Sequence, residues 1–229
     1  MISKENFEKF GFFQKEKFLS QDLLNKLNNF FDKSFENTDQ NVIKHEYIHL
    51  QNFKVLNRVF HEIRKTILNK LKINLLLRNV WMQRSYNDTI KKDLPYIPHI
   101  DKKRYFKLFL YLNDIKLENG PFTVSINSDI KKNEILRKNW WIKNQEGANH
   151  HDDRHGLLIN DNELVYQKIC LPAGSIVGFD TNCPHYASSI DKNCYRNVLR
   201  FNFYSTFNNK FSFSFLKKKI LTEFKKFRT

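Results

Sequence analysis

The chain has 229 residues and a formal net charge of +15, and 41% of its residues are hydrophobic. This length allows one sizeable domain with its own apolar core, and no run approaches the roughly 20 apolar residues of a membrane span. Three cysteines without a Cys-x-x-Cys pair favour a reduced chain over a disulfide framework. We therefore predict a single domain over residues 1–229, with its core at about 5–206, in a cytoplasmic protein.

The N-terminal third is predicted to form a helical layer on the outside of a sheet. Ser20 can cap a helix whose apolar residues recur at spacings of three and four, namely Leu23, Leu24, Leu27, Phe30 and Phe31. The same periodicity predicts a second helical region, broken once, over Val42–Leu71. On this basis His45, His49 and His61 are expected on helix surfaces.

The periodicity then changes to short runs that are rich in β-branched and aromatic residues, which predicts strands separated by Gly and Pro turns. The predicted strands are Leu75–Tyr86, Tyr96–Asp101, Tyr105–Asn113, Phe122–Ile126, Leu164–Leu171, Ser175–Phe179 and Tyr195–Thr206. A short helix over Ile130–Trp141 and a polar loop interrupt them. The pattern predicts a mainly β protein with flanking helices (α+β), built on an antiparallel double-sheet barrel of the jelly-roll, cupin-like type.

Residues 207–229 form a basic amphipathic tail. Its apolar residues Leu216, Ile220, Phe224 and Phe227 fall on one helical stripe with lysines opposite. The favoured interpretation is that the stripe covers the barrel, and the alternative is peripheral contact with an anionic membrane. Deletion of residues 216–229 separates the two, because it would lower thermal stability in the first case and remove vesicle binding in the second.

The net charge also raises the question of nucleic acid. Lys, Asn, Ile and Phe are all used heavily. An AT-rich coding sequence produces this bias in a protein of any function. Outside the tail, the lysines are scattered along the chain. A nucleic-acid-binding face usually shows clustered basic residues. A solvated basic surface is therefore favoured over binding to nucleic acid.

One candidate metal site stands out among the predicted strands. His99 and Asp101 are two residues apart on one strand, so their side chains share a face, and a later stretch, FDTNCPHYASS, supplies His185. Two histidines and one carboxylate form the facial triad of non-haem Fe(II) oxygenases. The His-x-Asp pattern recurs at His150 and His151, but in a polar insertion, and a rigid ligand pair is better placed on a strand. We predict His99, Asp101 and His185 as the metal ligands.

The segment HIDKKRYFKLFLYLNDIKLENGPFTV, followed by AGSIVGFDTNCPHYASSIDKNCYRNVLRFNFY, resembles the phytanoyl-CoA dioxygenase-like branch of the Fe(II)- and 2-oxoglutarate-dependent oxygenases. The opening FGFFQKEKFLSQDLLNKL resembles the start of that family, so the likeness covers most of residues 5–206. It implies a double-stranded β-helix with an N-terminal helical layer that uses Fe(II), 2-oxoglutarate and O2. It also implies hydroxylation of a C–H bond in a small-molecule or lipid-like substrate, and the retained Asp101 favours hydroxylation over halogenation.

The resemblance also assigns co-substrate residues. Arg196, eleven residues after His185, matches the arginine that grips the distal carboxylate of 2-oxoglutarate, a role that suits the bidentate guanidinium. Arg200 lies on the same strand face and is the rival, expected farther from the metal. Gln83 matches a position that often contributes to the co-substrate pocket. Lys107 is predicted to face inward by its parity with Phe109 and Tyr111, and it is a further candidate for binding the co-substrate.

The chain departs from the family pattern at INSDIKK, residues 126–132, where relatives usually carry a Pro-Gly-Ser-His segment. This departure leaves open a catalytically idle barrel that binds a metal or an anionic ligand. The net charge leaves open a nucleic-acid demethylase, which requires binding to DNA or RNA with a steep salt dependence. Turnover of 2-oxoglutarate to succinate separates an enzyme from an idle barrel.

Overall fold

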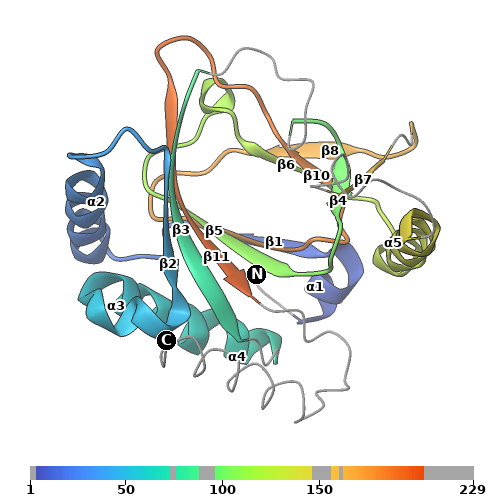
Figure 1. Ribbon diagram of the computed structural model, residues 1–229, viewed down its shortest axis with the longest axis horizontal. Coiled ribbons are helices and arrows are strands. Elements are labelled where there is room, and N and C mark those ends of the chain that lie inside the picture. Colours follow the sequence, from blue (N-terminus) through green and yellow to red (C-terminus); the bar gives the residue numbers. More distant parts are fainter. Residues whose placement is uncertain (1–3, 73–75, 88–95, 146–155, 160–161, 204–229) are drawn as a thin grey trace.

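Two antiparallel sheets lie against each other in the computed structural model, and helices cover the outer face of the larger one (Figure 1). The structure describes residues 4–72, 76–87, 96–145, 156–159 and 162–203. The predicted tail at 207–229 and the histidines of the polar insertion lie outside these residues. The arrangement is a double-stranded β-helix, which confirms the predicted jelly-roll core with its N-terminal helical layer.

The larger sheet has six strands in the order β1-β9-β5-β11-β3-β2. In chain order they are β1 (Phe12–Lys15), β2 (Val42–Glu46), β3 (Leu77–Tyr86), β5 (Phe106–Tyr111), β9 (Ile176–Asp180) and β11 (Tyr195–Phe203). The smaller sheet has the order β7-β4-β10-β6-β8. Its strands are β4 (His99–Asp101), β6 (Phe122–Ser125), β7 (Gly156–Leu158), β8 (Tyr166–Ile169) and β10 (His185–Ala187).

The helices of the N-terminal region shield the large sheet from solvent (Figure 1). In chain order they are α1 (Lys4–Phe10), α2 (Gln21–Phe35), the 3-10 helix η1 (Tyr47–Asn52), α3 (Lys54–Ile63), a π-helical turn (Arg64–Leu68) and α4 (Asn69–Leu71); η3 (Leu117–Asn119) and α5 (Ile130–Gln145) follow later. The predicted cap is confirmed, because the Leu23 amide donates to Ser20 Oγ at the start of α2. Among the described residues, no helix combines the length and the apolarity that crossing a membrane requires.

The predicted helix over Val42–Leu71 is wrong at its start. Val42–Glu46 is a strand that pairs in register with β3, from Val42 opposite Gln83 to Glu46 opposite Asn79. The helical spacing of apolar residues begins only at Leu56, and backbone pairing with a ten-residue strand decides the structure of the earlier segment. His45 therefore lies on a strand, half-buried, with Nε2 3.2 Å from the Met82 sulfur, and burial lowers its pKa.

Three short strands escaped prediction, namely β1, β7 and β10. Each has only three or four residues, too few for a period of two to be visible. The predicted strand over Tyr96–Asp101 is shorter in the structure, where β4 begins at His99 after Pro98. Proline has no amide to donate to a neighbouring strand, so pairing starts after it.

Gly178 on β9 is required by the packing of the first strand. A methyl group at this position would lie 2.4 Å from the ring of Phe13 and 3.0 Å from that of Phe106, and both rings are buried. We expect Gly178→Ala to lower the free energy of unfolding by about 1–3 kcal/mol through overpacking. Urea denaturation of the purified protein measures the change.

A double-mutant cycle with Phe13→Leu isolates the cause. Because the smaller side chain removes the clash, the double variant is expected to lose less stability than the sum of the two single losses. Strict additivity would show that the cost at Gly178 comes from elsewhere.

Candidate metal centre

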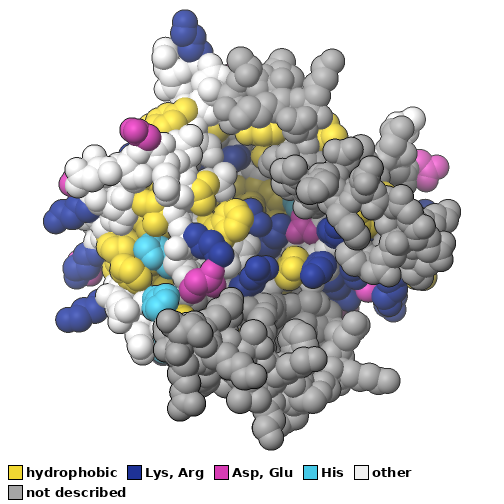
Figure 2. Space-filling view, viewed as in Figure 1, with side chains coloured by type: hydrophobic (Ala, Val, Ile, Leu, Met, Phe, Trp, Pro, Cys, Tyr) yellow, Lys and Arg dark blue, Asp and Glu magenta, His cyan; other side chains and the backbone are white. Residues whose placement is uncertain are grey.

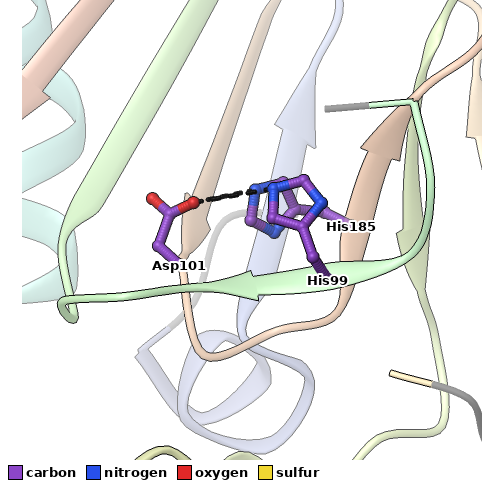
Figure 3. Close-up of side chains that lie close together, drawn as sticks. All are labelled: His99, Asp101 and His185. Carbon is purple, nitrogen blue, oxygen red and sulfur yellow. Dashed lines mark ion pairs between the residues drawn. The ribbon is translucent and has the colours of Figure 1, made fainter. Parts of the chain in front are cut away.

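The three predicted ligands converge between β4 and β10 (Figure 3). His185 lies directly opposite His99 in the antiparallel pair of these strands, and Asp101 follows His99 by two residues on the same face. All three side chains are buried. The atoms that they can offer to a metal ion all lie within 4.8 Å of one another. The structure therefore brings the predicted triad together.

Backbone carbonyls fix both imidazole rings. His99 Nδ1 lies 2.8 Å from the Ile97 carbonyl oxygen, and His185 Nδ1 lies 2.9 Å from that of Cys183. A carbonyl oxygen only accepts, so each Nδ1 carries the proton and each Nε2 presents its lone pair. Both Nε2 atoms point at the same carboxylate oxygen, Asp101 Oδ1, at 3.7 Å from His99 and 3.6 Å from His185.

This geometry fits a divalent transition metal. Bonds of about 2.1 Å at right angles would place neighbouring ligand atoms about 3 Å apart, somewhat closer than the 3.7 and 3.6 Å between the two Nε2 atoms and Asp101 Oδ1. Burial, and then the neighbouring His99, hold the pKa of His185 well below its usual range, so its imidazole is neutral and able to ligate. Among the described residues, this is the cluster of three ligating side chains that could hold an ion.

The turn between β9 and β10 positions His185. The Cys183 amide donates to the Asp180 carbonyl at 2.8 Å, and the Asn182 amide donates to Asp180 Oδ1 at 3.0 Å. The Asp180 carboxylate in turn accepts from Arg104 Nε at 2.8 Å. The Asp101 amide donates to the Thr181 carbonyl at 3.1 Å, which ties the turn to the other ligand strand.

The helix α5, which begins within the segment that departs from the family pattern, braces this turn. The Asp129 carboxylate accepts from the amides of Lys131 and Lys132, and α5 begins there. From α5, Asn133 Nδ2 donates to the Asn182 carbonyl at 3.0 Å, and Arg137 Nε donates to Asn182 Oδ1 at 3.0 Å. The helix that begins in the departing segment therefore braces the turn that precedes His185.

Lys107 forms an ion pair with the carboxylate oxygen of Asp101 that faces away from the histidines, Oδ2. Burial, and then the charge of Arg200, lower the pKa of Lys107 to about 8, against the opposite effect of Asp101. Burial alone would raise the pKa of Asp101, but Lys107 and the two histidines lower it. The carboxylate is thus ionised, with Oδ1 left for a metal.

A cavity of about 350 Å³ opens from the triad into the space between the two sheets. Figure 2 shows the hollow, with basic side chains gathered around acidic and histidine side chains. Every predicted site residue lines it: His99, Asp101, Lys107, His185, Gln83 and Arg196. Sequence reasoning missed the aromatic walls, which are Trp81, Phe122, Phe179 and Tyr186. Trp81 could have been found, because it shares strand parity with Gln83.

The two arginines of β11 reach different parts of this cavity. Arg196 donates to the Gly120 carbonyl and lies near Tyr111, whose pKa burial raises to about 12. Arg200 acts electrostatically on Asp101 and Lys107 instead. The expectation that Arg200 lies away from the metal site is therefore wrong, because the pairing of β11 with β5 places Arg200 opposite Phe109, two residues from Lys107, the partner of Asp101.

No protein-family model and no curated protein matches the sequence, so membership of the phytanoyl-CoA dioxygenase-like branch stays a prediction. Solved structures do match the fold. The epimerase SnoN, solved with Fe3+, alpha ketoglutarate and nogalamycin RO, has 12% identity and a TM-score of 0.64 over 87% of this chain and 81% of its own.

Two further structures match over similar lengths. HygX from Streptomyces hygroscopicus, with nickel and 2-oxoglutarate bound, has 13% identity and a TM-score of 0.62, over 90% of this chain and 88% of its own. EvdO2 from Micromonospora carbonacea var. aurantiaca, complexed with 2-oxoglutarate, has 14% identity and a TM-score of 0.59, over 88% of this chain and 89% of its own. The chain thus has the double-stranded β-helix fold of these three proteins, each of which was solved with 2-oxoglutarate (alpha ketoglutarate) bound.

Proposed function

We propose that the protein is an Fe(II)- and 2-oxoglutarate-dependent oxygenase that hydroxylates a C–H bond of a small-molecule or lipid-like substrate. One observation carries the proposal. Two imidazoles, each locked by a backbone carbonyl with Nε2 facing inward, meet one carboxylate oxygen at the edge of a cavity. A facial set of this composition leaves the other metal positions open for co-substrate and O2.

When bound, iron with 2-oxoglutarate supplies the oxidising power for attack on a C–H bond. The chain's own residues bind and orient the metal and the co-substrate. His99 Nε2, His185 Nε2 and Asp101 Oδ1 hold the metal on one side, while Lys107 keeps Asp101 Oδ2 occupied. Arg196 receives the distal carboxylate of 2-oxoglutarate. The aromatic walls exclude water from the reacting atoms.

The structural neighbours support the cofactors more than the outcome of the reaction. One is solved with Fe3+ and alpha ketoglutarate and others with 2-oxoglutarate, yet they include an epimerase and a carbocyclase. Hydroxylation is favoured here by the carboxylate ligand Asp101 and by the sequence resemblance. A product that is heavier than its substrate by one oxygen atom distinguishes it from those two reactions.

The proposal is tested by turnover of 2-oxoglutarate. Purified protein supplied with Fe(II), ascorbate and air is expected to convert 2-oxoglutarate to succinate, slowly even without its primary substrate. Omission of iron or of O2 should stop succinate formation, which mass spectrometry quantifies. Iron binding without any succinate would instead favour the catalytically idle barrel.

A further inference from the structure

The cavity holds a second arginine that the co-substrate does not need. Arg196 and Arg200 occupy the same face of β11 four residues apart, so their Cα atoms are separated by about 13 Å. Arg200 lies opposite Phe109 on one side and Trp81 on the other. The two guanidinium groups therefore start from different ends of the cavity. If Arg196 serves 2-oxoglutarate, Arg200 is left for another ligand.

The side chain of Arg200 is held in place by residues of its own sheet. Its Nε donates to Asn202 Oδ1 at 2.8 Å, and Asn202 Nδ2 donates to Asn79 Oδ1 at 2.9 Å. Its guanidinium carbon lies 4.6 Å from the centre of the Trp81 ring, over which it stacks. Its two terminal nitrogens have no hydrogen-bond partner among the described residues. The guanidinium group of Arg200 is thus pre-organised, and its two terminal nitrogens can still donate hydrogen bonds to a ligand.

The charges around the cavity are not balanced. Among the described residues that line it, Asp101 is the one acidic side chain, and Lys107 is already paired with it. The charges of Fe(II) and of the 2-oxoglutarate dianion cancel. The two arginine charges then remain, in a space with apolar walls where uncompensated charge is costly.

We propose that Arg200 binds a carboxylate group of the primary substrate, so that the enzyme acts on a small organic acid. The inference rests on the proposed function and names the substrate class. A planar guanidinium with two free outer nitrogens matches a carboxylate in a bidentate pair. The aromatic rings of Trp81 and Phe109 beside it suit an apolar body attached to that carboxylate. The cavity volume, about 350 Å³, suits a small molecule.

The test compares acids with their neutral amides. The anaerobic complex of the protein with Fe(II) and saturating 2-oxoglutarate is titrated with hexanoate, phenylacetate and phenyl phosphate, and with hexanamide and phenylacetamide. We expect at least one of the two carboxylates to bind about ten-fold or more tightly than its amide, from the strength of a charged hydrogen bond. Arg200→Met should remove this preference, whereas Arg58→Met, on the exposed surface of α3, should keep it.

Three results would overturn the inference. The first is equal binding of each acid and its amide, or no binding of either, by a protein that still binds Fe(II) and 2-oxoglutarate. The second is preferential binding of phenyl phosphate alone. The third is a loss of 2-oxoglutarate affinity in Arg200→Met as large as that in Arg196→Met, which would make Arg200 the co-substrate anchor. Failure to bind Fe(II) or 2-oxoglutarate at all would instead contradict the proposed function.

Discussion

Replacing His99 or His185 with alanine is expected to reduce Fe(II)-dependent conversion of 2-oxoglutarate to background. Each substitution removes one of the two Nε2 atoms that can bind the metal beside Asp101 Oδ1. No other described ligating residue joins this cluster. Both variants should keep the β-helix fold, because these rings face the cavity rather than the main apolar core. Succinate formation, iron content and far-UV circular dichroism give the three readouts.

Two sets of controls accompany these variants. His49→Ala removes an exposed histidine of η1 and should change neither iron content nor turnover. His150→Ala and His151→Ala remove the other His-x-Asp candidates and should leave turnover largely intact. Unchanged turnover in His99→Ala or His185→Ala would refute the triad, and loss of turnover only in the His150 or His151 variants would assign the metal to that segment.

The second large effect is expected at Arg196. Arg196→Lys keeps a positive charge but loses the fork that pairs with a carboxylate, at a cost of roughly 1.5–3 kcal/mol for a charged hydrogen bond. The apparent KM for 2-oxoglutarate should rise about ten-fold or more, while iron content stays the same. The lysine side chain is shorter, so the variant also loses the hydrogen bond from Arg196 to the Gly120 carbonyl.

Arg200→Lys is the matched comparison, on the same strand face and in the same cavity. Its effect on the KM for 2-oxoglutarate should be much smaller. A larger rise in Arg200→Lys than in Arg196→Lys would exchange the two assignments. The measurement is the dependence of succinate formation on 2-oxoglutarate concentration for both variants.

The ligand triad could be predicted from the sequence because strand geometry is local. A spacing of two residues places His99 and Asp101 on one face of any strand, whatever the strand's length. The same parity placed Lys107 on the cavity side of β5, as the structure confirms. That His185 lies opposite His99 depends on the order of the strands in the sheet, which the sequence analysis did not predict.

The parts that could not be predicted depend on tertiary contacts. The predicted helix extends the periodicity that begins at Leu56 back to Val42, but pairing with β3 makes Val42–Glu46 a strand. The ion pair between Lys107 and Asp101 joins strands of the two different sheets, and the bracing of Asn182 by α5 joins segments that are distant in the chain. The position of Arg200 near the triad depends on the register of β11 against β5, which the parity of a strand does not determine.

The central claim is that His99, Asp101 and His185 bind one Fe(II) ion that 2-oxoglutarate then chelates. The most direct test is an anaerobic titration of the protein with Fe(II) and 2-oxoglutarate, followed by the visible charge-transfer absorption that this chelate produces. We expect the absorption to reach its plateau at one iron per chain and to be absent in His99→Ala, Asp101→Ala and His185→Ala. An absorption that persists in these variants, or wild-type protein that binds iron without developing any, would contradict the account.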